Sequence, residues 1–165
     1  MEGNKSKPRA LLVFGAPCSG KTTFSEKFAE KFDLALYDFD MLKDQYRLTR
    51  KNTLLIIKLI ARTGKTIIIE GGLSTERERA EIRNLLRSVG YEPSLVWIQT
   101  DVTTIRNRLK ARYKSVSKAK EIFDNELSAM EAPSEAEEPI ILSGKHTFET
   151  QTKHVLAGLA ENGKA

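Results

Sequence analysis

Residues 15–22 read GAPCSGKT, which matches the pattern G-x-x-x-x-G-K-[ST] at every fixed position. An apolar run, 10–14, precedes the motif, and an amphipathic helical pattern, 23–32, follows it, as a strand–loop–helix context requires. Gly15 and Gly20 let the backbone curl so that successive N–H groups point inward, and the N-terminus of the next helix adds partial positive charge. The sequence therefore predicts a P-loop that binds the phosphates of a nucleoside triphosphate.

Individual residues of this loop have expected roles. Lys21 is expected to reach the β- and γ-phosphates, and the Thr22 hydroxyl is expected to hold Mg²⁺. Cys18 stands at a variable position and is expected to be a small filler rather than a nucleophile. The predicted nucleotide-binding residues are Gly15, Ala16, Pro17, Cys18, Ser19, Gly20, Lys21, Thr22 and Thr23.

The bulk properties favour one globular domain, 1–165, in a reducing compartment. The composition is 40% hydrophobic and 30% charged, and the length suits a single domain. One cysteine excludes an internal disulfide framework, so we expect a cytoplasmic location. Residues 1–9 are polar without an apolar signal core, and the apolar stretches are too short to span a bilayer. The sequence specifies no oligomeric state.

The net charge of +5 is unevenly spread. Residues 101–120 hold seven bases and one acid, whereas 121–138 hold seven acids and no base. The basic segment suits nucleic acid, the phosphates of a bound nucleotide, or a solvated helix face. The acidic stretch 131–139 is expected to be a solvated connector.

Short apolar strands alternate with helical patterns, which predicts a parallel sheet covered on both faces. Glycines mark the junctions, and Ser74 and Asp101 stand where helix N-caps are expected. The expected strands are 10–14, 34–37, 66–70, 95–99 and 139–142. The expected helices are 21–32, 41–47, 52–62, 76–88, 102–112, 117–130 and 150–161. Ligands of such sheets bind beyond the carboxyl ends of the strands.

Acidic residues stand at two of these strand ends. Asp38 and Asp40 are two apart, so in an extended segment both point to the same side. We assign Asp38 to the metal and Asp40 to deprotonation of an acceptor hydroxyl, with a helix N-cap as the alternative for each. Glu70 ends the apolar strand 66–70 as a Walker B carboxylate does, and it has either a metal or a structural role.

Two arginines of the basic segment share one helix face. Arg108 and Arg112 are four residues apart, so their guanidinium groups can clamp a transferring phosphoryl group, or they are surface charges. Arg106 faces elsewhere. Residues 142–145 follow the last strand, where their backbone can meet a nucleotide base. His146 and His154 have no acidic partners at metal-ligand spacing, so we assign neither to zinc.

With GAPCSGKT, the strand-end DFD, the IIIEGG strand and the Arg-rich helix in place, the chain resembles small P-loop kinases. It is similar to the AAA-type zeta-toxin/polynucleotide-kinase-like ATP-binding group, which borders on gluconate and shikimate kinases. The resemblance covers about residues 9–160. It implies a three-layer α/β P-loop NTPase fold, with a five-stranded parallel sheet in the order 2-3-1-4-5 and helices on both faces. It also implies a mobile helical lid at about 112–130 and ATP- and Mg²⁺-dependent phosphoryl transfer with Asp40 as base. Lys43 stands where the polynucleotide-kinase-like members have Arg, and Glu70-Gly71-Gly72 lacks the triple glycine of shikimate kinases.

Three functions are compatible with these residues. The first is transfer of the γ-phosphoryl group of ATP to a hydroxyl of a small molecule, with Lys21, Asp40, Arg108 and Arg112 as catalytic residues. The second is a polynucleotide or nucleotide kinase, which the basic helix favours but which the lack of aromatic residues interleaved with bases disfavours. The third is a nucleotide-dependent regulatory module with weak ATPase activity.

Overall fold

In the computed structural model, which describes residues 7–162, five parallel strands form one sheet. The strands are β1 (Arg9–Phe14), β2 (Ala35–Asp38), β3 (Ile67–Glu70), β4 (Glu92–Gln99) and β5 (Ile140–Ser143). Their order is β2-β3-β1-β4-β5, which confirms the predicted topology. Residues 1–6, where we expected no signal segment, lie outside the described residues.

The central strand β1 is buried on both faces of the sheet. Its residues alternate between two separate apolar clusters, with Leu12 in one and Leu11 and Val13 in the other. It pairs with β3 and β4 in parallel register, so Val13 lies opposite both Glu70 and Val96. Both clusters are buried because helices cover each face of the sheet, and this explains the continuous apolar run in the sequence.

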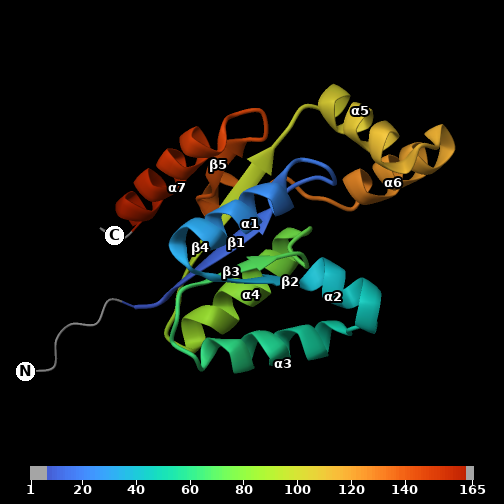
Figure 1. Cartoon of the computed structure of the whole chain (residues 1–165). Helices are drawn as coiled ribbons and strands as arrows, with labels where there is room; N and C mark the ends of the chain where they lie inside the picture. The colour runs from blue at the N-terminus through green and yellow to red at the C-terminus, as the bar shows by residue number, and fades with distance from the viewer. Residues whose placement is uncertain (1–6, 163–165) are drawn as a thin grey trace, which may run out of the picture.

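The helices form two layers and a projecting hairpin (Figure 1). They are α1 (Lys21–Phe32), α2 (Phe39–Tyr46), α3 (Arg50–Ala61), α4 (Glu76–Ser88), α5 (Val102–Tyr113), α6 (Val116–Ser128) and α7 (Phe148–Asn162), with a 3-10 turn at Glu135–Glu137. Helices α1 and α7 cover one face of the sheet, while α3 and α4 cover the other. Helices α5 and α6 pack on each other around Ile105, Leu109 and Phe123. Among the described residues, no helix has both the length and the apolar composition that crossing a bilayer requires.

Helix caps explain where two of these helices begin. The Asp101 carboxylate accepts a hydrogen bond from the Thr104 N–H, which confirms the predicted N-cap of α5. The predicted N-cap at Ser74 is wrong. Thr75 caps α4, because its hydroxyl accepts from the Glu78 N–H while the Glu78 carboxylate accepts from the Thr75 N–H. This reciprocal capping box satisfies two free N–H groups at once, so the capping residue is Thr75, while α4 begins at residue 76 as predicted.

A buried ion pair joins α4 to the segment before β5. Arg79 is fully buried, and its guanidinium donates to both carboxylate oxygens of Glu137, at 2.7 and 2.9 Å. It also donates to the carbonyl oxygens of Leu73, Ser74 and Glu131, and it lies over the Phe14 ring. The expectation of a solvated connector over 131–139 is therefore wrong at Glu137, which is only 7% exposed.

Replacement of Arg79 by Met should lower the free energy of unfolding by about 3–5 kcal/mol, because it leaves the Glu137 charge buried without its partner. Urea unfolding followed by Trp97 fluorescence measures this loss. Arg77→Met, at an exposed position of the same helix, is the matched control. Equal midpoints for the two variants would contradict the assigned role.

The contribution of this pair should also depend on pH. The hydrogen bond from Arg79 holds the pKa of Glu137 below its ordinary value of 4.5. The stabilisation is therefore complete above pH 4.5 and is lost as the pH falls through the lowered folded-state pKa. The difference in the free energy of unfolding between wild type and Arg79→Met should therefore become smaller as the pH falls below 4.5, as urea unfolding at several pH values would measure.

Candidate active site

The loop between β1 and α1 folds tightly over the carboxyl edge of the sheet. A Cβ atom at Gly15 would collide with the Ile98 carbonyl oxygen of β4, so only glycine fits there. Cys18 and Gly20 adopt positive φ angles of 57° and 105°. The Ser19 N–H donates to the Ala16 carbonyl oxygen at 3.1 Å, which closes the turn. These conformations give the curled backbone that the motif predicts, directly before the N-terminus of α1.

Thr22 and Glu70 meet where α1 and β3 approach each other. The Thr22 hydroxyl donates to Glu70 Oε1 at 2.5 Å. Glu70 is only 2% exposed, and its Oε2 has no hydrogen-bond partner among the described residues. Burial raises the pKa of Glu70, against the opposing effects of the hydrogen bond from Thr22 and of the Lys21 charge. A buried carboxylate with a free oxygen favours a cation beside it.

This pair of oxygen ligands fits Mg²⁺. The ion takes few protein ligands and completes its shell with water and phosphate oxygens, so it needs no protein cage. Accordingly, the described residues contain no group of three or more His, Cys, Asp or Glu side chains arranged to hold a metal. Thr22 and Glu70 are the residues that would hold the ion next to the bound phosphates.

Asp38 and Asp40 do not share one extended segment, so the geometry predicted for them is wrong. Helix α2 begins at Phe39, because Asp38 caps it by accepting from the Met41 N–H at 2.9 Å. Asp38 is therefore an N-cap, the alternative that the sequence left open, although it lies close enough to Glu70 to raise the pKa of that residue. Its metal role stays a prediction.

Asp40 lies in the first turn of α2 and packs against the loop after β3. Its Oδ1 accepts from the Gly72 N–H at 3.0 Å. A Cβ atom at Gly71 would collide with the Asp40 backbone nitrogen, and the φ of 86° at Gly71 also favours glycine. Gly71 and Gly72 thus let α2 approach the sheet closely, and the loop holds the Asp40 carboxylate in a fixed orientation.

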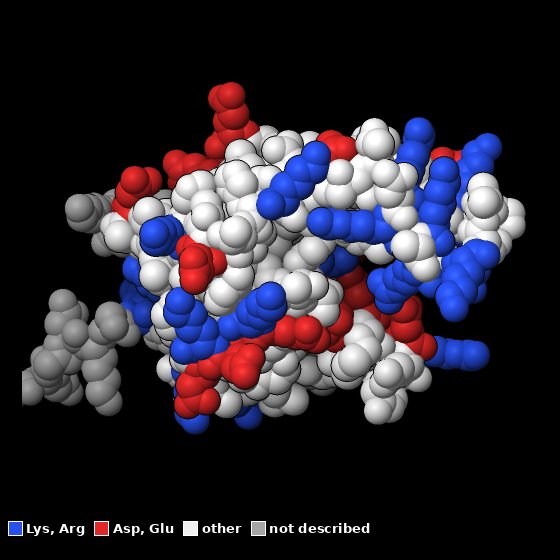
Figure 2. All heavy atoms as spheres, turned by 45° about the horizontal axis from the view of Figure 1, so that its top comes forward, with Lys and Arg blue, Asp and Glu red and all other residues white. Residues whose placement is uncertain are grey.

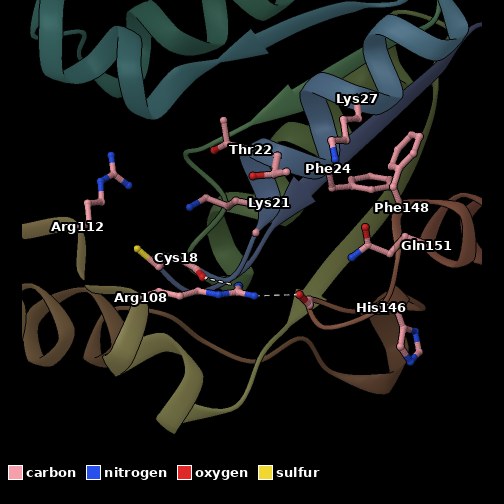
Figure 3. A pocket seen from close by; sticks show the side chains of 13 residues that line it. Cys18, Lys21, Thr22, Phe24, Lys27, Arg108, Arg112, His146, Phe148 and Gln151 are labelled. Carbon is pink, nitrogen blue, oxygen red and sulfur yellow. Dashed lines mark hydrogen bonds between the residues drawn. The ribbon is translucent and has the colours of Figure 1, made fainter. Parts of the chain in front are cut away.

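Arg108 and Arg112 contact different parts of the site (Figure 3). The Arg108 guanidinium crosses the P-loop and donates to the carbonyl oxygens of Cys18, Ser19 and Gly144, at 3.0, 3.3 and 3.3 Å. Arg112 stands on the other side of the cavity from Phe148. Arg108 therefore joins the P-loop to the segment after β5, while Arg112 lies free of those contacts.

Two cavities meet at the P-loop. The first, the P-loop cavity, has a volume of about 430 Å³ and the second, the α2–α6 cavity, about 700 Å³. Cys18, Lys21, Thr22 and Arg112 line both. The other residues lining the P-loop cavity are Gly20, Thr23, Phe24, Lys27, Arg108, Gly144, His146, Phe148 and Gln151. Asp38, Asp40 and Glu70 line the α2–α6 cavity.

The backbone of 142–145 was predicted to lie near a nucleotide base, but the cavity-lining side chains Phe148 and Gln151 that follow it were not predicted. Phe148 packs beside Phe24, and the Gln151 amide donates to the Ser143 carbonyl oxygen at 2.8 Å. Gly144 packs so closely on Thr100 and Ser19 that a Cβ atom would collide with both. Phe148 and Gln151 are three residues apart, and this helical spacing is a sequence signal that places them on one face of α7.

This combination of P-loop, buried strand-end carboxylate and sheet order agrees with the family comparison. Residues 11–136 match the family model AAA_33, which is described as an AAA domain. The chain belongs to this family. No curated protein gives a match.

Solved structures of kinases share the fold of this AAA domain over nearly its whole length. A gluconokinase from Sinorhizobium meliloti has a TM-score of 0.71 at 16% identity, with 97% of this chain and 96% of that chain covered. The APS kinase of Mycobacterium tuberculosis has a TM-score of 0.68 at 17% identity, with 93% and 98% covered. The shikimate kinase of Aquifex aeolicus has a TM-score of 0.56 at 19% identity, with 93% and 97% covered. The fold is that of small P-loop kinases.

Arg108→Ala should weaken ATP binding by roughly 10-fold, because hydrogen bonds from a charged group then no longer fix the P-loop carbonyls. Arg112→Ala should change the ATP dissociation constant by less than about 3-fold, since Arg112 makes no such bond. Isothermal titration with an ATP analogue measures both constants. Arg106→Ala, on the same helix but outside both cavities, is the control. Equal losses for Arg108→Ala and Arg112→Ala would refute this division of roles.

Proposed function

We propose that this AAA domain transfers the γ-phosphoryl group of ATP to a hydroxyl group of a small molecule. The observation that carries the proposal is the junction of the two cavities at Lys21, Thr22 and Arg112. P-loop residues line both cavities, and the α2–α6 cavity also contains the Asp40 carboxylate. A donor and an acceptor bound in these cavities would meet beside two cationic side chains, which is the arrangement that phosphoryl transfer requires.

In this mechanism the P-loop N–H groups and Lys21 bind the β- and γ-phosphates. The acceptor oxygen attacks the γ-phosphorus, the bond to the β–γ bridging oxygen breaks, and ADP leaves. Asp40 accepts the proton of the hydroxyl, while Lys21 and Arg112 stabilise the charge on the transferring group. Mg²⁺ held by Thr22 and Glu70 would neutralise the phosphate oxygens.

The predicted lid at 112–130 corresponds to the end of α5 and the whole of α6. Lys114 adopts a left-handed conformation with a φ of 50°, which ends α5 and reverses the chain into α6. Tyr113, Ile122, Glu126 and Met130 line the α2–α6 cavity from this side. Closure of the hairpin over that cavity would exclude water, which otherwise competes with the acceptor for the phosphoryl group.

The placement of the basic residues supports a small acceptor over a nucleic acid. Arg106, Lys110 and Lys120 line a separate cavity of about 320 Å³ between α5 and α6 and contribute to neither of the other two. Figure 2 shows the Lys and Arg side chains gathered over the α5–α6 end of the molecule.

The single cysteine remains the reason for a proposed cytoplasmic location.

Incubation with γ-labelled ATP, Mg²⁺ and a metabolite extract should give a labelled small product. Lys21→Ala should abolish this transfer, because the loss of the ammonium removes the main cationic contact to the β- and γ-phosphates. Lys153→Ala, at an exposed position of α7, is the matched control. Label that appears only as free phosphate would contradict the proposed transfer.

Asp40→Asn should lower the rate of transfer by roughly 10²–10⁴-fold while leaving ATP affinity unchanged, because the amide keeps the acceptor for Gly72 N–H but cannot take a proton. Asp33→Asn, at the exposed end of α1, is the control for the change of charge. Single-turnover measurements separate transfer from binding. Wild-type transfer in Asp40→Asn would show that Asp40 serves only to position α2.

A further inference from the structure

The α2–α6 cavity has an unequal distribution of charge. Its side nearest the P-loop carries the cations Lys21 and Arg112. Its outer walls carry Asp44 on α2 and Glu126 on α6, and Lys43 is the one further cation among the described lining residues. Figure 2 shows acidic side chains across the hollow beneath the blue α5–α6 end.

The acids of this cavity lack cationic partners from the protein. Among residues 7–162, Asp40, Asp44 and Glu126 form no salt bridge. Partial burial raises the pKa of Glu126, and the charges of Asp40 and Asp44 add to this effect while Lys21 and Arg112 oppose it. The three carboxylates therefore line the same space, and among the described residues neither Asp44 nor Glu126 has a cation within salt-bridge distance, although Lys21 and Arg112 act on Glu126 from farther away.

A second feature of the cavity also indicates a shortage of cations. The buried Glu70 also lines this cavity, and its Oε2 has no hydrogen-bond partner among the described residues. A Mg²⁺ ion at Thr22 would satisfy Glu70, the β- and γ-phosphates would occupy Lys21, and Arg112 would contact the transferring phosphoryl group. Neither ligand would neutralise Asp44 and Glu126, which lie on the walls where the acceptor is expected.

We propose that the acceptor carries a protonated amine as well as its hydroxyl group, and that Asp44 and Glu126 bind this ammonium. The inference rests on the proposed phosphotransferase function. Ile122, Met41 and Met130 provide apolar contact for the carbon skeleton between the two polar groups. An anionic acceptor would meet Asp44 and Glu126 with only Lys43 to pair its charge, so its carboxylate or phosphate would be repelled.

Fractionation of a metabolite extract by ion exchange tests this assignment. Cationic, neutral and anionic fractions are each incubated with the wild-type protein, γ-labelled ATP and Mg²⁺, and the labelled product is traced to its fraction. Label from the cationic fraction is the expected result. Label only from the neutral or anionic fraction would overturn the assignment while leaving the phosphotransferase intact. No labelled product from any fraction would overturn the phosphotransferase itself.

Variants of the cavity wall then test the residues. For a cationic acceptor, Glu126→Gln and Asp44→Asn should each lower kcat/KM by roughly 10-fold or more through KM, as expected for loss of a charge-assisted contact. N-acetylation of the acceptor amine should remove the difference between wild type and these variants. Glu121→Gln, on the exposed face of α6, is the control and should behave as wild type. Unchanged KM in both wall variants would refute the role of Asp44 and Glu126.

Discussion

The parallel pairing of β1 with β3 is the constraint on which the site depends. Val13 lies opposite Glu70, so β3 ends one residue before the level at which the P-loop leaves β1. This register brings the Glu70 carboxylate to the Thr22 hydroxyl at the start of α1. A slip of one residue would turn Glu70 to the opposite face of the sheet, where α3 and α4 pack, and would bury its charge in an apolar cluster.

Local signals were sufficient to predict the elements, because the P-loop motif, the apolar strands and most helix starts each occupy a short stretch of sequence. The strand order came from the family resemblance, and the structure confirms it. The Asp38-Phe39-Asp40 segment was harder, because its sequence suits both an extended strand end and a helix start. In the structure this segment is a helix start, because the Met41 N–H donates to the Asp38 carboxylate and α2 begins at Phe39.

Several contacts between distant residues could not be predicted from the sequence. Arg79 and Glu137 are 58 residues apart, and each resembles the surface charges around it. Arg108 and Arg112 share a helix face as the spacing indicates, but the spacing does not determine what each guanidinium reaches. Arg108 binds carbonyl oxygens because α5 crosses beside the P-loop and Gly144, whose positions depend on the packing of β4 and β5.

If the proposed function holds, the same electrostatic arrangement would link acceptor binding to closure of the α5–α6 hairpin. Glu126 on α6 lines the same cavity as Asp40 and Asp44 on α2. A movement of α6 toward α2 would therefore bring like charges together. Such repulsion favours the open arrangement when the space between them holds only water. An ammonium group between the walls reverses the sign of the interaction, and a ligand that binds one arrangement more tightly shifts the population toward it. On this reasoning a cationic acceptor would promote closure of its own site, whereas the site would stay open with ATP bound alone.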